Sequence, residues 1–126
     1  MDAAQALADL TEISSQVEAA VLFDEGGSVA GSTLADAAAA EALARAAGDL
    51  LARASSLGSG TVTQVEASTP TGSVFVVRDG TRLIAATTAA DPTTGLVFYD
   101  LKSALRGSEG AKKPRRRRTK KDDDAA

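Results

Sequence analysis

The sequence predicts an α/β domain of the segregated α+β kind, in which helices cover both faces of an antiparallel sheet. The expected elements follow in the order α-β-β-α-β-β-β-α, without the repeated strand–helix alternation of parallel nucleotide-binding folds. All strand connections but one are short enough for hairpins, which indicates antiparallel pairing. Residues 74–77 and 83–86 are continuously apolar, as in strands that are covered on both faces.

Apolar spacing places the N-terminal elements. Leucines and an isoleucine recur at helical intervals over residues 2–14 and predict an amphipathic helix. Residues 17–23 then form a strand that is apolar on both faces, and residues 28–31 form a weaker return strand. Gly26 and Gly27 lie between these strands and supply the positive φ angles of a tight turn.

A long alanine-rich helix is expected over residues 34–57. Ser32 or Thr33 is predicted to cap its start, and Gly58 to end it. Leucines recur along this segment every seven residues, with alanines between them. On another side, charges of alternating sign recur every four residues, which is typical of a solvated helix face or of a surface for a partner. These charged residues are Glu41, Arg45, Asp49 and Arg53.

The C-terminal half is expected to form three strands and a helix. Asp79-Gly80 is the strongest hairpin signal in the chain. The aromatic side chains of the whole sequence, Phe23, Phe75, Phe98 and Tyr99, are expected to fill the core. The strands are expected over residues 61–67, 73–78 and 81–88, and the helix from residues 91–94 to Arg106.

Two regions follow from these assignments. Residues 1–106 are expected to form one folded domain, and residues 107–126 a disordered basic tail that ends in acidic residues. No signal-peptide pattern is visible, and no apolar run approaches the ~20 residues that cross a bilayer. The expected location is therefore cytoplasmic.

The composition excludes several kinds of chemistry. The chain has no Cys and no His, which excludes disulfides, Cys/His zinc sites and imidazole bases. A Walker-type loop needs Gly-Lys-Ser/Thr, whereas the glycine stretch at residues 26–31 holds no Lys and follows Asp24 and Glu25. We therefore expect no catalytic residue, no metal and no cofactor, and we do not expect an enzyme.

The formal net charge of −3 hides an uneven distribution. Residues 1–111 hold six Lys/Arg and fourteen Asp/Glu, a balance of −8, whereas residues 112–126 hold eight Lys/Arg and three Asp, a balance of +5. The basic tail suits nucleic-acid phosphates, an anionic membrane surface, an acidic partner or the acidic body of its own chain. Its basic residues are Lys112, Lys113, Arg115, Arg116, Arg117, Arg118, Lys120 and Lys121.

With these elements in place, the chain resembles the roadblock family, that is, dynein light chain roadblock and its bacterial relatives. The resemblance rests on Leu7-x-x-Leu10 followed by VEAAVLFDEGGSVAGS, on the hairpin VFVVRDGTRLIAA and on GLVFYDLKSAL, and it extends to about Arg106. It implies a roadblock/profilin-like three-layer sandwich with a five-stranded antiparallel sheet between helices. Bacterial members commonly act with small Ras-like GTPases, as scaffolds or as activators.

The resemblance implies a non-enzymatic homodimeric regulator or scaffold of a small Ras-like GTPase, with the charged helix residues named above as the partner-binding set. A heterodimer with a paralogue stays open. The alternative function is an adaptor whose basic tail binds nucleic acid or an anionic membrane surface. A third reading, a small-ligand sensor, lacks a convergent polar pocket in the sequence.

Dimerisation in the family joins the third strands of two copies edge to edge and places their long helices side by side. In this chain, residues 61–67 supply such an edge strand, and uncovered edges recruit further strands. Small residues on the long helix allow a second helix to approach closely. The expected interface residues are Val62, Gln64, Val65, Glu66, Ala40, Leu43, Ala47, Leu50 and Ala54.

Overall fold

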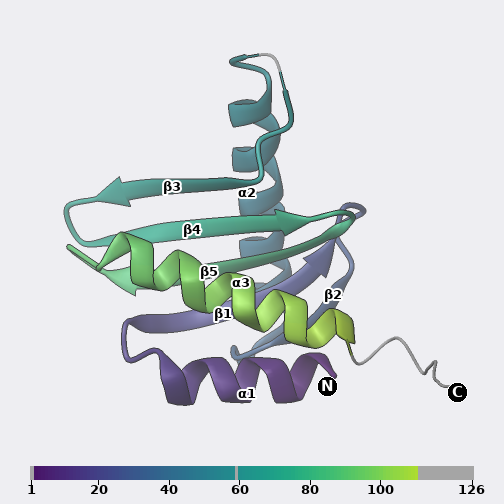
Figure 1. The fold of residues 1–126 in the computed structure, drawn as a ribbon, viewed down its shortest axis with the longest axis vertical. Helices are drawn as coiled ribbons and strands as arrows, with labels where there is room; N and C mark the ends of the chain where they lie inside the picture. Colours follow the sequence, from purple (N-terminus) through teal and green to yellow (C-terminus); the bar gives the residue numbers. More distant parts are fainter. Residues whose placement is uncertain (1, 59, 111–126) are drawn as a thin grey trace, which may run out of the picture.

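The computed structural model describes residues 2–58 and 60–110 and shows a five-stranded antiparallel sheet with helices on both faces (Figure 1). The strand order across the sheet is β2-β1-β5-β4-β3, so β2 and β3 form its edges. The predicted fold class and order of elements are confirmed. The elements are α1 (Ala3–Ile13), β1 (Val17–Asp24), β2 (Val29–Ser32), α2 (Ala37–Ser55), β3 (Gln64–Thr69), β4 (Gly72–Asp79), β5 (Arg82–Ala89) and α3 (Thr94–Gly110).

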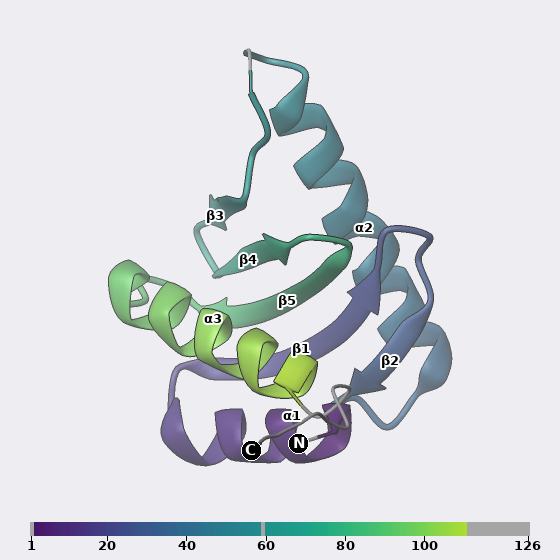
Figure 2. The same ribbon diagram turned by 45° about the vertical axis from the view of Figure 1, so that its right-hand side comes forward.

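The helices form two layers around the sheet. Helices α1 and α3 lie on one face and α2 lies on the other (Figure 2). Phe75, Ile84 and Leu101 belong to the buried cluster under α1 and α3, whereas Val76 and Leu51 belong to the cluster under α2. Neighbouring residues of β4 thus point to opposite faces, which explains why its central run is continuously apolar.

Alanines dominate the face of α2 that meets the sheet. Ala40, Ala44, Ala47 and Leu51 are the buried residues of this helix, and small side chains let a helix approach a sheet closely. The seven-residue leucine repeat lies instead on the flank of α2. Leu43 and Leu50 are half-buried there, and Leu57, beyond the end of the helix, is 87% exposed.

The start of α2 and the end of α3 differ from the sequence prediction. Helix α2 begins after Asp36, whose Oδ1 accepts a hydrogen bond from the backbone N–H of Ala38 at 3.0 Å, so the predicted cap at Ser32 or Thr33 is wrong. The side chain of Ser32 instead accepts from the backbone N–H of Leu34. An aspartate is a strong N-cap, and its charge also interacts favourably with the helix N-terminus.

Helix α3 continues to Gly110, past the predicted end at Arg106. Ser108 is buried, accepts a hydrogen bond from Nη2 of Arg82 at 2.7 Å and donates to the backbone oxygen of Leu105 at 2.9 Å. The bond from Arg82 attaches the last turns of α3 to the start of β5. The predicted tail therefore begins within this helix, and the part of it from residue 111 onward lies outside the described residues.

The strands confirm the predicted hairpins, but both ends of β3 lie later in the chain than predicted. Asp79 ends β4 and Arg82 begins β5, so Gly80, with φ 65°, lies in the connecting turn as expected. Strand β3 runs over Gln64–Thr69 rather than residues 61–67, because its pairing with β4 continues to the Thr69–Gly72 pair. Pro70 has no N–H to donate and lies in the turn.

The aromatic residues divide between the core and the surface. Phe75 and Phe98 make an edge-to-face contact with ring centroids 5.0 Å apart, which is a favourable geometry for aromatic pairs. Phe23 is buried, but Tyr99 is 69% exposed. The prediction that Tyr99 fills the core is wrong, because its position on α3 points away from the sheet-facing row of Val97, Leu101 and Ala104. No helix within the described ranges is long and apolar enough to cross a bilayer.

Replacing Leu101 with Ala is expected to lower the free energy of unfolding by about 2–5 kcal/mol, because it removes buried methyl groups and leaves a cavity. Leu101 is 0% exposed, whereas Leu96 in the same helix is 51% exposed. Leu96→Ala is therefore the matched control, with an expected cost below about 1 kcal/mol. Urea denaturation of both variants at one protein concentration measures the difference, and equal losses would contradict the described orientation of α3.

Candidate functional site

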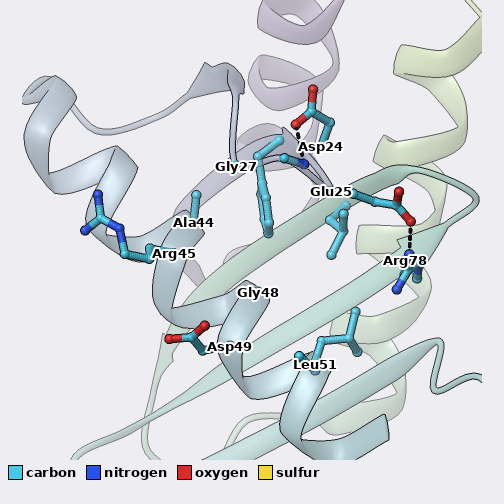
Figure 3. Close-up of a pocket in the computed structure, with 13 residues that line it drawn as sticks. Asp24, Glu25, Gly27, Ala44, Arg45, Gly48, Asp49, Leu51 and Arg78 are labelled. Atoms are coloured by element: carbon cyan, nitrogen blue, oxygen red, sulfur yellow. Dashed lines mark hydrogen bonds and ion pairs between the residues drawn. The ribbon is translucent and has the colours of Figure 1, made fainter.

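The candidate site is a hollow between α2 and the turn that joins β1 to β2 (Figure 3). Its volume is about 410 Å³, and its floor is made by buried apolar side chains of Phe23, Leu51 and Leu83. Charged residues line its rim from several elements. They are Asp24 and Glu25 in and after β1, Arg45 and Asp49 on α2, and Arg78 on β4.

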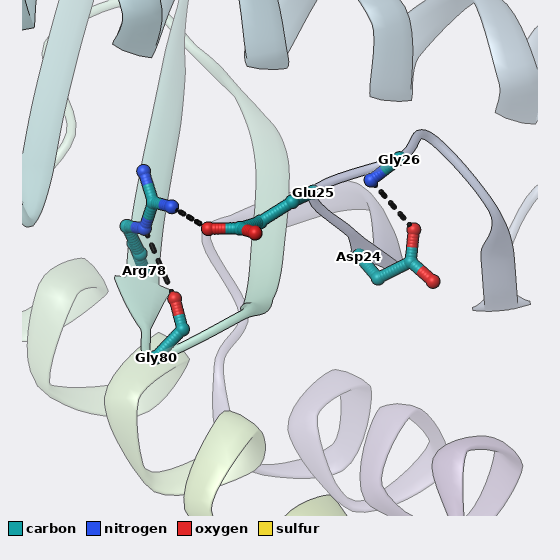
Figure 4. Close-up of polar contacts among 5 residues, drawn as sticks. All are labelled: Asp24, Glu25, Gly26, Arg78 and Gly80. Carbon is teal, nitrogen blue, oxygen red and sulfur yellow. Dashed lines mark hydrogen bonds and ion pairs between the residues drawn. The ribbon is translucent and has the colours of Figure 1, made fainter.

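The β1–β2 turn is held by one aspartate. Oδ1 of Asp24 accepts a hydrogen bond from the backbone N–H of Gly26 at 2.9 Å (Figure 4). It also accepts one from the backbone N–H of Ser28 at 3.0 Å. The N–H of Gly27 donates to the backbone oxygen of Asp24 at 2.9 Å, and Gly27 has φ 91°. The N–H groups that would bind a phosphate therefore already donate to the carboxylate of Asp24. This glycine stretch turns the chain, as the sequence predicts.

An ion pair links this turn to the β4–β5 hairpin. Nη2 of Arg78 pairs with Oε2 of Glu25, and Nε of Arg78 donates to the backbone oxygen of Gly80 at 3.0 Å (Figure 4). The side chains of Arg78 and Glu25 are 26% and 49% exposed, so the pair contributes little to stability. It does fix the positions of one positive and one negative group at the rim of the hollow.

Helix α2 presents its charged residues to solvent. Glu41, Arg45, Asp49 and Arg53 are all exposed, as the sequence predicts for the partner-binding set. Arg45 and Asp49 extend from successive turns of α2 at the rim of the hollow (Figure 3). The structure thus brings part of this set together with Glu25 and Arg78, which no sequence pattern relates to it.

Local sequence patterns do not reveal this convergence, and no polar pocket is predicted from them. The signal for it was weak, since Arg78 and Glu25 are far apart in the chain and only the antiparallel pairing of β1, β5 and β4 brings their ends together. Both hairpin turns lie at one end of the sheet, where the side chains of Glu25 and Arg78 meet. Among residues 2–58 and 60–110, no group of metal-ligating side chains gathers.

The residues expected at a dimer interface divide into two sets. Ala40 and Ala47 are 3% and 1% exposed and pack on the sheet of their own chain, so they offer no surface to a partner. The expectation that Ala40 and Ala47 contact a second copy is therefore corrected: both belong to the core of their own chain. Both lie on the helix face of Ala44 and Leu51, which the leucine repeat of the sequence did not reveal.

The remaining interface residues belong to α2, to β3 and to the segment that precedes β3. Val62, Val65, Leu43 and Leu50 are half-buried around the cluster beneath α2. Ala54 is also half-buried, Gln64 is exposed and Glu66 is half-buried. Oε1 of Glu66 accepts a hydrogen bond from Oγ1 of Thr94 at 3.3 Å, so this side chain faces α3. Their role in an interface stays a prediction.

Comparison with known proteins identifies the fold. No protein-family profile matches the sequence, and no curated protein matches it. A crystal structure of a Roadblock/LC7 domain from Streptomyces avermitilis superposes with a TM-score of 0.79 and 19% sequence identity, over 88% of this chain and 98% of that one. The chain has the roadblock fold.

Two MglB structures share the roadblock fold with this chain. The gliding protein MglB from Thermus thermophilus superposes with a TM-score of 0.63 and 19% identity, over 84% of each chain. A structure of MglB with a tetrameric arrangement gives a TM-score of 0.62 and 19% identity, over 82% of this chain and 85% of that one. The predicted resemblance to the roadblock family is therefore matched by the three-dimensional structure.

Two glycine substitutions test the geometry of the hollow. Gly27→Ala is expected to lower the free energy of unfolding by about 1–2 kcal/mol, because Gly27 has a positive φ and a residue with a Cβ is strained there by about that amount. Gly48→Ala is expected to raise it by up to about 1 kcal/mol, because Gly48 lies inside α2 and an added Cβ meets no atom within 4 Å. Urea denaturation measures both changes. A Gly27→Ala variant as stable as the original chain would contradict the described turn.

Proposed function

We propose that this chain is a non-enzymatic, homodimeric regulator or scaffold of a small Ras-like GTPase. The roadblock fold supports the proposal, together with the resemblance of the sequence to bacterial roadblock proteins. The observation that carries it is the exposed surface of α2, where charges of both signs stand next to a hollow with an apolar floor. Such a combination suits a protein partner better than a small polar substrate.

The edge of β3 supports a dimer. The backbone N–H of Arg78 donates to the oxygen of Thr63 at 2.8 Å, which makes these residues a hydrogen-bonded pair at the start of the β3–β4 ladder. Hydrogen-bonded pairs alternate along antiparallel strands, so Gln64 and Glu66 direct their backbone groups away from β4. The described part of the chain places no strand on that side, and MglB itself occurs in a tetrameric arrangement.

The flank of α2 continues this edge. In both views the C-terminal end of α2 extends past β3 (Figures 1 and 2). Leu50 and Ala54 are half-buried on this flank, and Leu57 follows it with 87% exposure. A second copy that pairs along β3 buries these apolar side chains against its own α2. We therefore place the interface on β3 and on this flank, without Ala40 and Ala47.

Gln64→Pro is expected to weaken the dimer at least about 10-fold, because it removes an outward N–H of the edge strand while leaving the bonds to β4 in place. Gln64→Ala keeps the N–H and is the matched control, with an unchanged dimer dissociation constant. Sedimentation equilibrium over a dilution series measures both constants. A chain that is a monomer at micromolar concentration contradicts the proposed dimer.

The partner is proposed to bind across Glu41, Arg45, Asp49 and Arg53. The double variant Arg45→Glu and Arg53→Glu is expected to weaken binding of a Ras-like GTPase from the same organism at least about 10-fold, or roughly 1.4 kcal/mol. Arg106→Glu is the control, since Arg106 is exposed on α3, across the sheet from α2. Titration calorimetry with the GTPase in its GTP-bound and GDP-bound forms measures the affinities. Equal affinities for the two variants would refute the α2 site.

The basic tail favours a second candidate function, an adaptor that binds nucleic acid or an anionic membrane surface. Eight basic residues within residues 112–126 carry this candidate. Deleting residues 111–126 is then expected to abolish retention on DNA or on anionic vesicles. If all the basic residues meet DNA phosphates, log affinity falls against log salt concentration with a slope of about −7. Unchanged retention after deletion rejects this candidate.

A further inference from the structure

A second groove lies on the opposite face of the molecule from α2, between α1 and α3. These two helices pack side by side over the same face of the sheet (Figure 2). The groove has a volume of about 300 Å³. Ile13 and Tyr99 line it with 71% and 69% of their surfaces exposed, and Gly107 lines it on a later turn of α3, near the C-terminal end of that helix.

The groove contains a largely buried aspartate whose carboxylate has no partner in the described part of the chain. Asp100 is 8% exposed and lines the groove from α3. Among residues 2–58 and 60–110, the side chain of Asp100 makes no hydrogen bond and no ion pair. The ion pair found in this part of the chain joins Arg78 to Glu25. The oxygens of Asp100 are not among the fully buried side-chain atoms that lack a partner, so they are open to the groove. Asp100 therefore presents an unpaired negative charge to the groove, and a cationic group bound there forms charge-assisted hydrogen bonds with it.

The lining of the groove has one sign of charge. Asp9 of α1 lies across from Asp100, and one of its oxygens accepts a hydrogen bond from Nε2 of Gln5 at 2.9 Å. No Lys or Arg lines this groove, in contrast to the hollow beside α2, which is lined by Arg45 and Arg78. The groove thus suits a positively charged chain segment.

We propose that the basic segment of this same chain, residues 111–126, binds in the groove between α1 and α3. The segment follows directly on Gly110, within one helical turn of Gly107. From Gly110 back to Asp100 is about 15 Å along α3, at roughly 1.5 Å per helical residue. An extended chain covers about 3.3 Å per residue, so roughly five residues span this distance. The arginines at 115–118 then lie beside Asp100 and Asp9.

Arginine fits these groups better than other side chains do. Its planar guanidinium donates two parallel hydrogen bonds to one carboxylate, and it also stacks on aromatic rings such as that of Tyr99. The segment has no large apolar side chain, so charge rather than apolar burial drives the contact. Its covalent attachment gives it a local concentration in the millimolar range. The contact also competes with DNA or an anionic membrane for the same arginines.

A spin label at one position tests the contact, because the chain has no Cys and Thr119→Cys creates a unique attachment site. In the full-length, ¹⁵N-labelled chain, the label is expected to broaden the amide signals of Asp9, Asp100 and Ser103 several-fold more than those of Glu41 and Arg45. Raising the salt concentration from about 50 to about 500 mM is expected to reduce the broadening, because salt screens the charges.

Two sets of variants separate the groove from other acidic surfaces. Asp9→Asn with Asp100→Asn is expected to remove the broadening, whereas Glu41→Gln with Asp49→Asn on α2 leaves it unchanged. If the first pair impairs folding, replacing the arginines at 115–118 with Gln gives the same loss without touching the described fold. In a mixture of spin-labelled ¹⁴N chains and unlabelled ¹⁵N chains, no broadening is expected.

Three results overturn the proposal. These are broadening centred on α2 or on the β1–β2 turn, no broadening anywhere at low salt, and broadening that persists in the mixed sample, which assigns the contact to a neighbouring chain. The proposed GTPase site lies on the other face of the sheet and is tested by separate binding measurements. None of these three results therefore contradicts the proposed function.

Discussion

The packing of the alanine face of α2 on the sheet is the constraint that shapes the surfaces of this protein. Ala40, Ala44 and Ala47 offer little apolar area, so β-strand side chains such as Phe23 and Val76 supply the volume of that core layer. Leu51 is the leucine of α2 that packs on that face. Leu43 and Leu50 lie on the flank of α2 and are half-buried, and the edge strand β3 directs backbone groups outward on the side where α2 ends. Both features favour a second copy on this side.

The sheet separates two surfaces with different electrostatics. On the α2 side, positive and negative groups alternate, and the ion pair of Glu25 with Arg78 adds to the mixture. A mixed surface selects a partner by register and orientation rather than by net charge. On the α1/α3 side, the groove is lined by carboxylates alone among its charged groups, which favours a cationic segment. The separation allows the two surfaces to be occupied at the same time.

The role of the glycine-rich turn between β1 and β2 depends on the side chains around it. Two adjacent glycines after an apolar strand also occur in phosphate-binding loops. Here Asp24 accepts hydrogen bonds from Gly26 and Ser28, so the amides point at a carboxylate of the same turn. The turn therefore contributes to a protein surface beside α2, and its acidic groups oppose a phosphate ligand.

The sequence by itself determined the fold class, the order of elements, the hairpins and the exposure of the charged row on α2, because these follow from local apolar spacing and turn chemistry. Only the tertiary structure decided which side of α2 meets the sheet, since alanines and leucines at neighbouring helical positions are nearly equivalent until a sheet of fixed twist selects one face. It also decided that Arg78 meets Glu25 and that Asp100 lines the groove between α1 and α3 without a partner among the described residues. Those contacts join residues distant in sequence, or depend on how two helices pack, and no local pattern encodes them.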